Sequence, residues 1–169
     1  MTGASCKTVL IGVGNPFRSD DGVGRIIVQR LRGEVPSNVK VQEESGDGTE
    51  LLEAWKGADC AFLVDAVQSG APPGTVHRLD ARTEKLPTWF AHTSTHAFGV
   101  AEAIELARIM GDLPNHLVVY GIEGLDFSAG TELSPEVAEV VPAAANLVLR
   151  EILQMKAISP ALSEQRHTK

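Results

Sequence analysis

The sequence predicts an α/β protein, a three-layer α/β/α sandwich around a mostly parallel, twisted sheet of about five strands. Strand-like apolar runs and helix-like segments alternate along nearly the whole chain, which is typical of such sandwiches. The runs at 9–13 and 61–67 are almost continuously apolar, as in strands that helices cover on both faces. With 169 residues the chain is long enough for one compact domain. We expect residues 1–156 to form this single domain and residues 157–169 to form a polar C-terminal tail.

The first half of the chain is predicted to contain three strands and two helices. Gly14 ends the first strand, and apolar residues recur at helical spacing after Asp21. Thr49 is a suitable N-cap for the second helix. Asp65 is the only charged residue of the third strand. In chain order the segments are a strand at 9–13, a helix from Asp21, a strand at 39–44, a helix at 49–56 and a strand at 61–67.

The second half is predicted to contain two strands and two further helical regions. His77 lies in an edge strand and is expected to be solvated. Ser134 followed by Pro135 is typical of a helix start. Pro142 should interrupt the last helix, so that a short turn precedes a longer helix from 142 to about 155. The other segments are the edge strand at 75–79, an irregular connection at 82–94, a helix that ends near Met110, and a strand at 117–122. Thr95 or Ser94 is expected to cap that helix. Its predicted buried face consists of Phe98, Ala101, Ile104 and Ile109.

The composition favours a cytoplasmic, monomeric protein that binds neither nucleic acid nor a membrane. The formal net charge is −7 and the isoelectric point is about 5.2, whereas nucleic-acid binding depends on clustered Lys and Arg. No signal-peptide pattern opens the chain, and no apolar run approaches the ~18 to 20 residues of a membrane span. Cys6 and Cys60 lack a CxxC or CxxH spacing. We therefore expect reduced thiols, with Cys60 in the core.

Polar residues gather where the strands of the predicted sheet end. Asp20 and Asp21 follow the first strand, Asp65 lies near the end of the third, and His92 and His96 precede a helix. In parallel sheets, ligands bind beyond the carboxyl ends of the strands. Two carboxylates and an imidazole suit zinc, nickel or another divalent ion, which would also relieve the repulsion between the carboxylates. Taken alone, Asp21 also suits the positive end of a helix dipole, and His92 competes with His96 as the imidazole.

The glycine-rich turn GVGNPFRSDDGVG, residues 12–24, does not fit a phosphate site. A dinucleotide-binding G-x-G-x-x-G motif that starts at Gly12 would need a small residue at position 17, where Phe17 stands. No GK[ST] triplet follows, so a P-loop is excluded as well. Asp20 and Asp21 would repel an anion at the start of the helix. We interpret the turn as one that presents Asp21 to a cation.

Three motifs together resemble those of the endopeptidases that mature the large subunit of [NiFe] hydrogenases. A strand followed by GxGN and then an acidic pair matches residues 12–24. A strand that ends in Asp-Ala matches VDAV at 64–67, and a His ahead of a helix matches STHAFG at 94–99. The sequence LSP at 133–135 is also similar. The resemblance extends from about residue 8 to residue 154.

This resemblance implies that residues 1–156 form a single protease domain located in the cytoplasm. Its substrate would be a [NiFe] hydrogenase large-subunit precursor, from which it would remove the C-terminal extension after nickel insertion. The family's metal-contacting and catalytic positions fall on Asp21, Asp65 and His96. The nickel would be supplied by the precursor, with another divalent metal as an alternative. Many members carry Glu in place of Asp21, so with the shorter side chain either the helix must approach the metal more closely or a water molecule must intervene.

Two glycine-rich loops are candidates to bind an extended peptide. Gly46, Asp47 and Gly48 form one of them, and residues 124–130 form the other. The family has a further acidic residue after the second strand, for which Glu44 and Asp47 compete. Asp20 is a candidate to position its neighbours or to cap the helix.

Two other functions are compatible with parts of the sequence. Peptidyl-tRNA hydrolases also open with GVGNP after a first strand, but Ser19-Asp20-Asp21-Gly22 stands where that family has a different motif, and the acidic composition disfavours tRNA. A non-catalytic nickel-binding maturation factor with the same fold would share every motif above. Shortening of the partner, as opposed to binding alone, distinguishes that factor from a protease.

Overall fold

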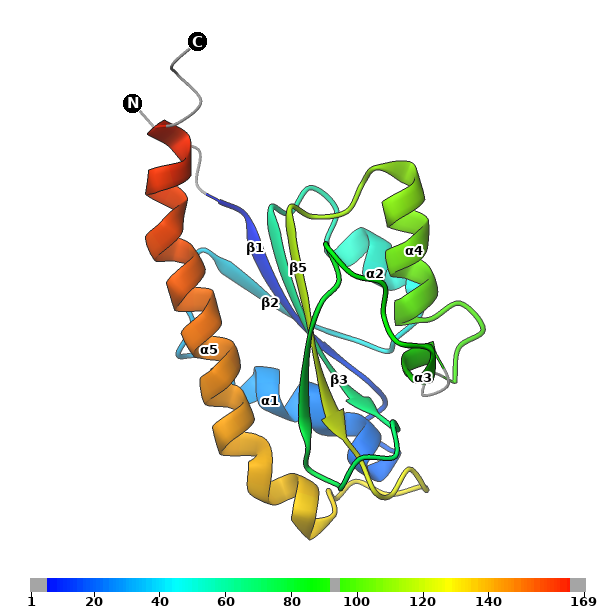
Figure 1. Ribbon diagram of the computed structural model, residues 1–169. Coiled ribbons are helices and arrows are strands. Elements are labelled where there is room, and N and C mark those ends of the chain that lie inside the picture. Colours follow the sequence, from blue (N-terminus) through cyan, green and yellow to red (C-terminus); the bar gives the residue numbers. More distant parts are fainter. Residues whose placement is uncertain (1–5, 92–94, 165–169) are drawn as a thin grey trace.

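The computed structural model describes residues 6–91 and 95–164, with side chains up to residue 155 (Figure 1). It is a three-layer α/β/α sandwich, which confirms the predicted fold class. The strands are β1 (Thr8–Val13), β2 (Val39–Glu44), β3 (Cys60–Val67), β4 (Val76–Asp80) and β5 (His116–Glu123). The helices are the 3₁₀ turn η1 (Ser19–Gly22), α1 (Val23–Leu31), α2 (Gly48–Ala54), α3 (Thr88–Ala91), α4 (Val100–Met110) and α5 (Pro135–Glu164).

The order of the strands places the switch point of the sheet between β1 and β3. The order is β2-β1-β3-β5-β4. Four strands are parallel, and β4, which lies at the edge as predicted, is antiparallel to β5. From β1 the chain passes to β2 on one side and then to β3 on the other. Sheets of this kind bind ligands in the crevice at the carboxyl ends of the strands beside the switch point.

Each face of the sheet has its own apolar core. On the face covered by α1 and α5, Leu10 and Phe62 are fully buried (Figure 1). On the face covered by α2 and α4, Ile11 and Leu63 are fully buried. Successive residues of a strand point to opposite faces, so burial on both faces explains the continuously apolar strands. Each such side chain stabilises the fold by about 2 kcal/mol.

The prediction that Pro142 interrupts the last helix is wrong. α5 runs through this residue without a break. Pro142 and Ala138, whose carbonyl loses its usual partner, both lie on the exposed side of the helix, where water can hydrate that carbonyl. Burial of the opposite side outweighs the roughly 3 kcal/mol that an interior proline costs. The buried residues of that side are Val137, Val141, Ala144, Ala145, Val148 and Ile152.

The C-terminal end of α5 lies beyond the predicted end of the domain. The helix continues to Glu164, whereas a polar tail was expected from residue 157. Residues 165–169 lie outside the described part of the chain. Within the described residues, no helix combines the length and the apolar character needed to cross a membrane.

α4 begins later than predicted. Its N-cap is Gly99, whose N–H donates to the Glu102 carboxylate at 3.1 Å. Thr95 therefore does not cap this helix, and Ser94 lies outside the described residues. The short helix α3 forms within the connection that was expected to be irregular.

The buried face of α4 differs from the predicted one at its end. Ile104 is fully buried as predicted, but Ile109 is 82% exposed. Ile109 is five residues from Ile104, which places it on the other side of a helix with 3.6 residues per turn. Val100, Ala103 and Ala107 complete the buried face instead.

The two cysteines, distant in sequence, lie side by side at the amino ends of β1 and β3. The Sγ atoms of Cys6 and Cys60 are 3.5 Å apart, and both thiols are free. Cys60 is 3% exposed, which confirms its predicted place in the core. Burial, reinforced by the hydrogen bond with Cys6, raises the pKa of the Cys60 thiol to about 12. Cys60 is therefore a poor nucleophile at neutral pH.

Candidate active site

A small cavity lies at the switch point of the sheet, beyond the carboxyl ends of β1 and β3. Its volume is about 20 Å³, which is enough for one water molecule or one ion. The structure brings the three predicted residues Asp21, Asp65 and His96 together around this cavity. The other residues that line it are Val13, Gly14, Ser45, Gly46, Thr95 and Val100.

Asp65 has a buried carboxyl group with few hydrogen-bond donors around it. It lies near the end of β3 and is 9% exposed. Burial, and then the charge of Asp21, raise the pKa of Asp65 well above its usual range, and a hydrogen bond with the backbone of Ala66 opposes them in part. An acid in such surroundings is stabilised by a positive charge or by protonation.

Asp21 is held at the cavity by the turn that follows β1. Its Oδ2 atom accepts a hydrogen bond from the Asn15 N–H at 2.9 Å and lies 3.8 Å from Nη1 of Arg18. Gly14 adopts a φ of +137°, and a Cβ atom there would lie 1.9 Å from the carbonyl oxygen of Asp21. Gly24 in turn lets α1 approach β3 closely, because a Cβ atom would lie 2.1 Å from the carbonyl oxygen of Val64. These glycines bring Asp21 to the end of the sheet.

Asp20, the neighbour of Asp21, points away from the cavity and holds a distant loop. It is fully buried and accepts hydrogen bonds from the N–H groups of Leu125, Asp126 and Ser134 and from the Ser134 hydroxyl, at 2.7 to 2.9 Å. Burial alone would raise the pKa of Asp20, but these hydrogen bonds outweigh it and hold the pKa below its usual range. Asp20 thus positions the loop that contains Leu125 and Asp126. It does not cap the helix, because neither η1 nor α1 has a side-chain cap.

His96 reaches the cavity from the segment that precedes α4. This segment is tied to the turn after β2, because the Gly48 N–H donates to the Phe98 carbonyl at 2.8 Å. Gly46 lies close to the imidazole, since a Cβ atom there would be 3.6 Å from Cδ2 of His96. His92, the predicted competitor, lies outside the described residues.

The three residues predicted to bind substrate have different surroundings. Gly46 lines the cavity. Asp47, and not Thr49, caps α2, because its carboxylate accepts from the Thr49 N–H at 2.9 Å. Gly48 is packed against the ring of Phe98 and uses its N–H for the Phe98 carbonyl. Gly46 is therefore the member of this loop with direct access to the cavity.

The donor atoms suit a divalent cation, although they do not converge on one point. Among the described residues, no three His, Cys, Asp or Glu side chains form a group that would hold a metal ion. Two carboxylates and one imidazole are nevertheless donors that nickel and zinc accept. A cation between Asp21 and Asp65 would also offset both the burial and the Asp21 charge that raise the pKa of Asp65. The residues fit an ion that arrives with further ligands of its own.

A second polar cluster, which the sequence did not predict, lies at the end of β5. Glu123 is 3% exposed and accepts from the N–H and hydroxyl groups of Ser69 and from the Gly70 N–H, at 2.7 to 3.1 Å. His77, expected to be solvated, lies 3.3 Å from the Glu123 carboxylate and packs against Trp89. The sequence signal that could have revealed Glu123 is the one used for Asp65, a charged residue at the end of an apolar strand. The Glu123 carboxylate has several hydrogen-bond donors from Ser69 and Gly70, and these bonds hold the turn after β3 in place.

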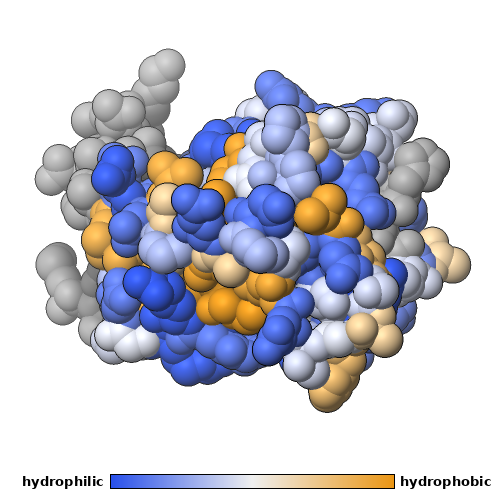
Figure 2. Space-filling view, turned by 90° about the horizontal axis from the view of Figure 1, so that it is seen from below, coloured by the Kyte–Doolittle hydropathy of each residue, from blue (hydrophilic) through white to orange (hydrophobic). Residues whose placement is uncertain are grey.

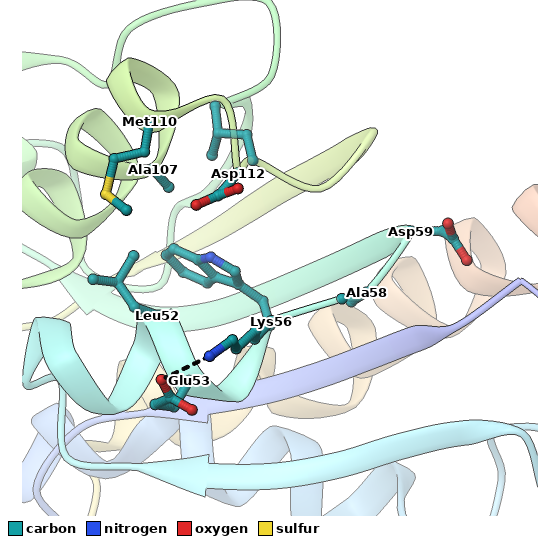
Figure 3. A pocket seen from close by; sticks show the side chains of 11 residues that line it. Leu52, Glu53, Lys56, Ala58, Asp59, Ala107, Met110 and Asp112 are labelled. Atoms are coloured by element: carbon teal, nitrogen blue, oxygen red, sulfur yellow. Dashed lines mark ion pairs between the residues drawn. The ribbon is translucent and has the colours of Figure 1, made fainter.

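A larger cavity, of about 500 Å³, lies at the opposite end of the molecule (Figure 3). It is formed where α2 and α4 end, with Leu52, Ala107 and Met110 on its apolar side. Lys56 and Glu53, an exposed ion pair, lie on one side of it. None of the predicted site residues lines this cavity, so size alone does not locate the chemistry.

The fold and the cavity define an α/β protein whose polar site lies at the switch point of a parallel sheet. The sequence profile of the family described as hydrogenase maturation protease matches residues 26–151, which include Asp65 and His96. The chain therefore belongs to the hydrogenase maturation protease family, and it is a peptide-bond hydrolase.

Similar proteins agree with this assignment. The hydrogenase 2 maturation protease of Escherichia coli is 29% identical over 147 residues, which cover 85% of this chain and 88% of that protein. The solution structure of an endopeptidase from Escherichia coli superposes with a TM-score of 0.78 at 27% identity and covers 89% of this chain and 93% of that one. The hydrogenase maturating endopeptidase HybD from Escherichia coli has the same fold, with a TM-score of 0.74 at 24% identity over 88% of this chain and 93% of that one.

Proposed function

We propose that this protein removes the C-terminal extension of a [NiFe] hydrogenase large-subunit precursor, and that it recognises the nickel ion of the precursor through Asp21, Asp65 and His96. The observation that supports this most directly is the ion-sized cavity that these three residues share. The matched family and the names of the relatives supply the class of substrate, a hydrogenase precursor.

Recognition of a metal that belongs to the substrate accounts for the open ligand set. The three side chains provide only part of a coordination sphere, and the precursor's own nickel ligands would provide the rest. Binding of the nickel between Asp21 and Asp65 would relieve the repulsion between them and would fix the position of the nearby scissile bond. When bound, the ion also supplies a Lewis acid next to the reacting peptide.

The surface around the cavity suits an extended peptide. Figure 2 views the molecule from below, where the parallel strands end, and shows hydrophobic residues among hydrophilic ones. Phe17 and Leu125, from the loops that follow β1 and β5, are 69% and 55% exposed. Apolar side chains of the extension would pack against them, while Gly46 leaves room for a peptide backbone near His96.

The test is to mix the purified protein with nickel-loaded and with nickel-free precursor and to measure the intact masses of the products. We expect shortening of the nickel-loaded precursor alone. His96→Gln should abolish the reaction, whereas the matched control His116→Gln, at an exposed histidine at the amino end of β5, should process normally. Equal shortening of both precursor forms would refute nickel recognition, and binding without shortening would refute the proposed reaction.

A further inference from the structure

The guanidinium of Arg18 places a positive charge beside the cavity. Nη1 of Arg18 lies 3.8 Å from Oδ2 of Asp21, the oxygen that also accepts the Asn15 N–H. The Arg18 side chain is 30% exposed, whereas that of Asp21 is 11% exposed. The guanidinium therefore approaches Asp21 from the solvent side.

The backbone of Arg18 is held by hydrogen bonds, whereas its side chain meets Asp21 in a longer ion pair. The Arg18 N–H donates to the Asn15 carbonyl, and the Arg18 carbonyl accepts from the Asp21 N–H. Arg18 also forms an isolated bridge with Gly130, in the loop that Asp20 holds. The contact with Asp21, by contrast, is an ion pair too long for a hydrogen bond. Because no hydrogen bond accompanies this charge attraction, a cation of higher charge can take the place of the guanidinium at Asp21.

Arg18 and a divalent cation would compete for the same carboxylate. A cation bound at Asp21 and Asp65 would lie next to the guanidinium and would be repelled by it. A free metal ion must overcome this repulsion without help. A nickel ion within a precursor brings electron-rich ligands, to which the displaced guanidinium can bind.

We propose that Arg18 is a specificity-determining residue that pairs with Asp21 in the free protein and thereby discriminates against free divalent cations in favour of nickel carried by the precursor. The inference rests on the proposed function, because it takes the cavity to be the nickel-recognition site. Arg18 would thus make the cavity bind an ion held by the substrate in preference to a free ion.

The first test measures the affinity for free Ni²⁺ by calorimetric titration of the metal-free protein. Arg18→Gln should bind Ni²⁺ about tenfold more tightly than the unmodified protein, because Coulomb's law gives an effect of about this size for a dication and a single charge several ångströms apart in a water-like medium. Arg18→Lys, which keeps the charge, should stay close to the unmodified protein. Arg30→Gln, at an exposed position of α1, is the matched control for the change in net charge and should have no effect.

The second test adds free Ni²⁺ to the processing assay with nickel-loaded precursor. Arg18→Gln should be inhibited at about tenfold lower Ni²⁺ concentration than the unmodified protein or Arg18→Lys. Equal Ni²⁺ affinities of the unmodified protein and Arg18→Gln, including no binding by either, would overturn the role of Arg18 alone. Failure of the unmodified protein to shorten nickel-loaded precursor would instead overturn the proposed function. Thermal unfolding of each variant shows that it is folded.

Discussion

Two buried acidic regions at the same end of the sheet have opposite electrostatics. At the junction of η1 with the loop at 124–134, Asp20 accepts four hydrogen bonds, and its pKa is lowered. In the cavity at the ends of β1 and β3, the Asp65 carboxyl has one backbone partner and a neighbouring negative charge, and its pKa is raised. Asp20 and Asp21 are adjacent in sequence, yet they belong to these two different regions.

This difference distinguishes carboxylates that stabilise the fold from carboxylates that are candidates to bind a ligand. A buried carboxylate with a full set of donors is stable as it stands. Glu123, with its donors from Ser69 and Gly70, is of this kind. A buried carboxylate without such donors is a candidate for a functional site. Asp65 is of this second kind, and Asp21 shares its cavity.

The largest effect is expected from Asp65→Asn. This substitution keeps the shape of the side chain but removes the charge that would bind nickel, so processing of nickel-loaded precursor should fall by at least about 100-fold. Intact-mass measurement of the precursor over time reports the rate. Because Asp65 is poorly compensated, urea unfolding at pH 7 should show that the variant is at least as stable as the unmodified protein. A variant that processes normally would show that Asp65 is not part of the reaction.

A loss of stability is expected from Asp20→Ala, in contrast to Asp65→Asn. Removal of the carboxylate leaves the N–H groups of Leu125, Asp126 and Ser134 without their partner, and the free energy of unfolding should fall by about 3 kcal/mol. Urea unfolding measures this change. Asp126→Ala is a suitable control, because its carboxylate accepts from the nearby Ser128 in an exposed turn. A similar loss of unfolding free energy in both variants would mean that the hydrogen bonds of Asp20 stabilise the fold no more than those of Asp126 in its exposed turn.

The sequence predicted the parts of this comparison that depend on local patterns. Continuous apolar runs predicted the strands, and the rule that parallel strands end at one edge predicted that Asp65 and Asp21 would meet. The partners of Asp20 were not predictable, because they lie more than 100 residues away and neither local pattern indicates that the two segments meet. Pro142 misled the prediction because the packing of the whole of α5 outweighs one local preference. The monomeric state and the cytoplasmic location stay predictions.

The smallest expected effect is a difference in how stability depends on pH. The folded pKa of Asp20 is below its ordinary value of 3.8, so Asp20 stabilises the fold above that pH, and this contribution is lost as the pH falls through the lowered pKa. The folded pKa of Asp65 is raised, so its contribution is present below pH 3.8 and is lost as the pH rises through the raised pKa. Urea unfolding in metal-free buffer between pH 3 and 7, roughly the range in which carboxyl groups titrate, measures both. Relative to the unmodified protein, Asp65→Asn should gain stability as the pH rises, whereas Asp20→Asn should lose less stability as the pH falls. Parallel curves for the two variants would mean that the two carboxyl groups do not differ in the way their hydrogen bonds indicate.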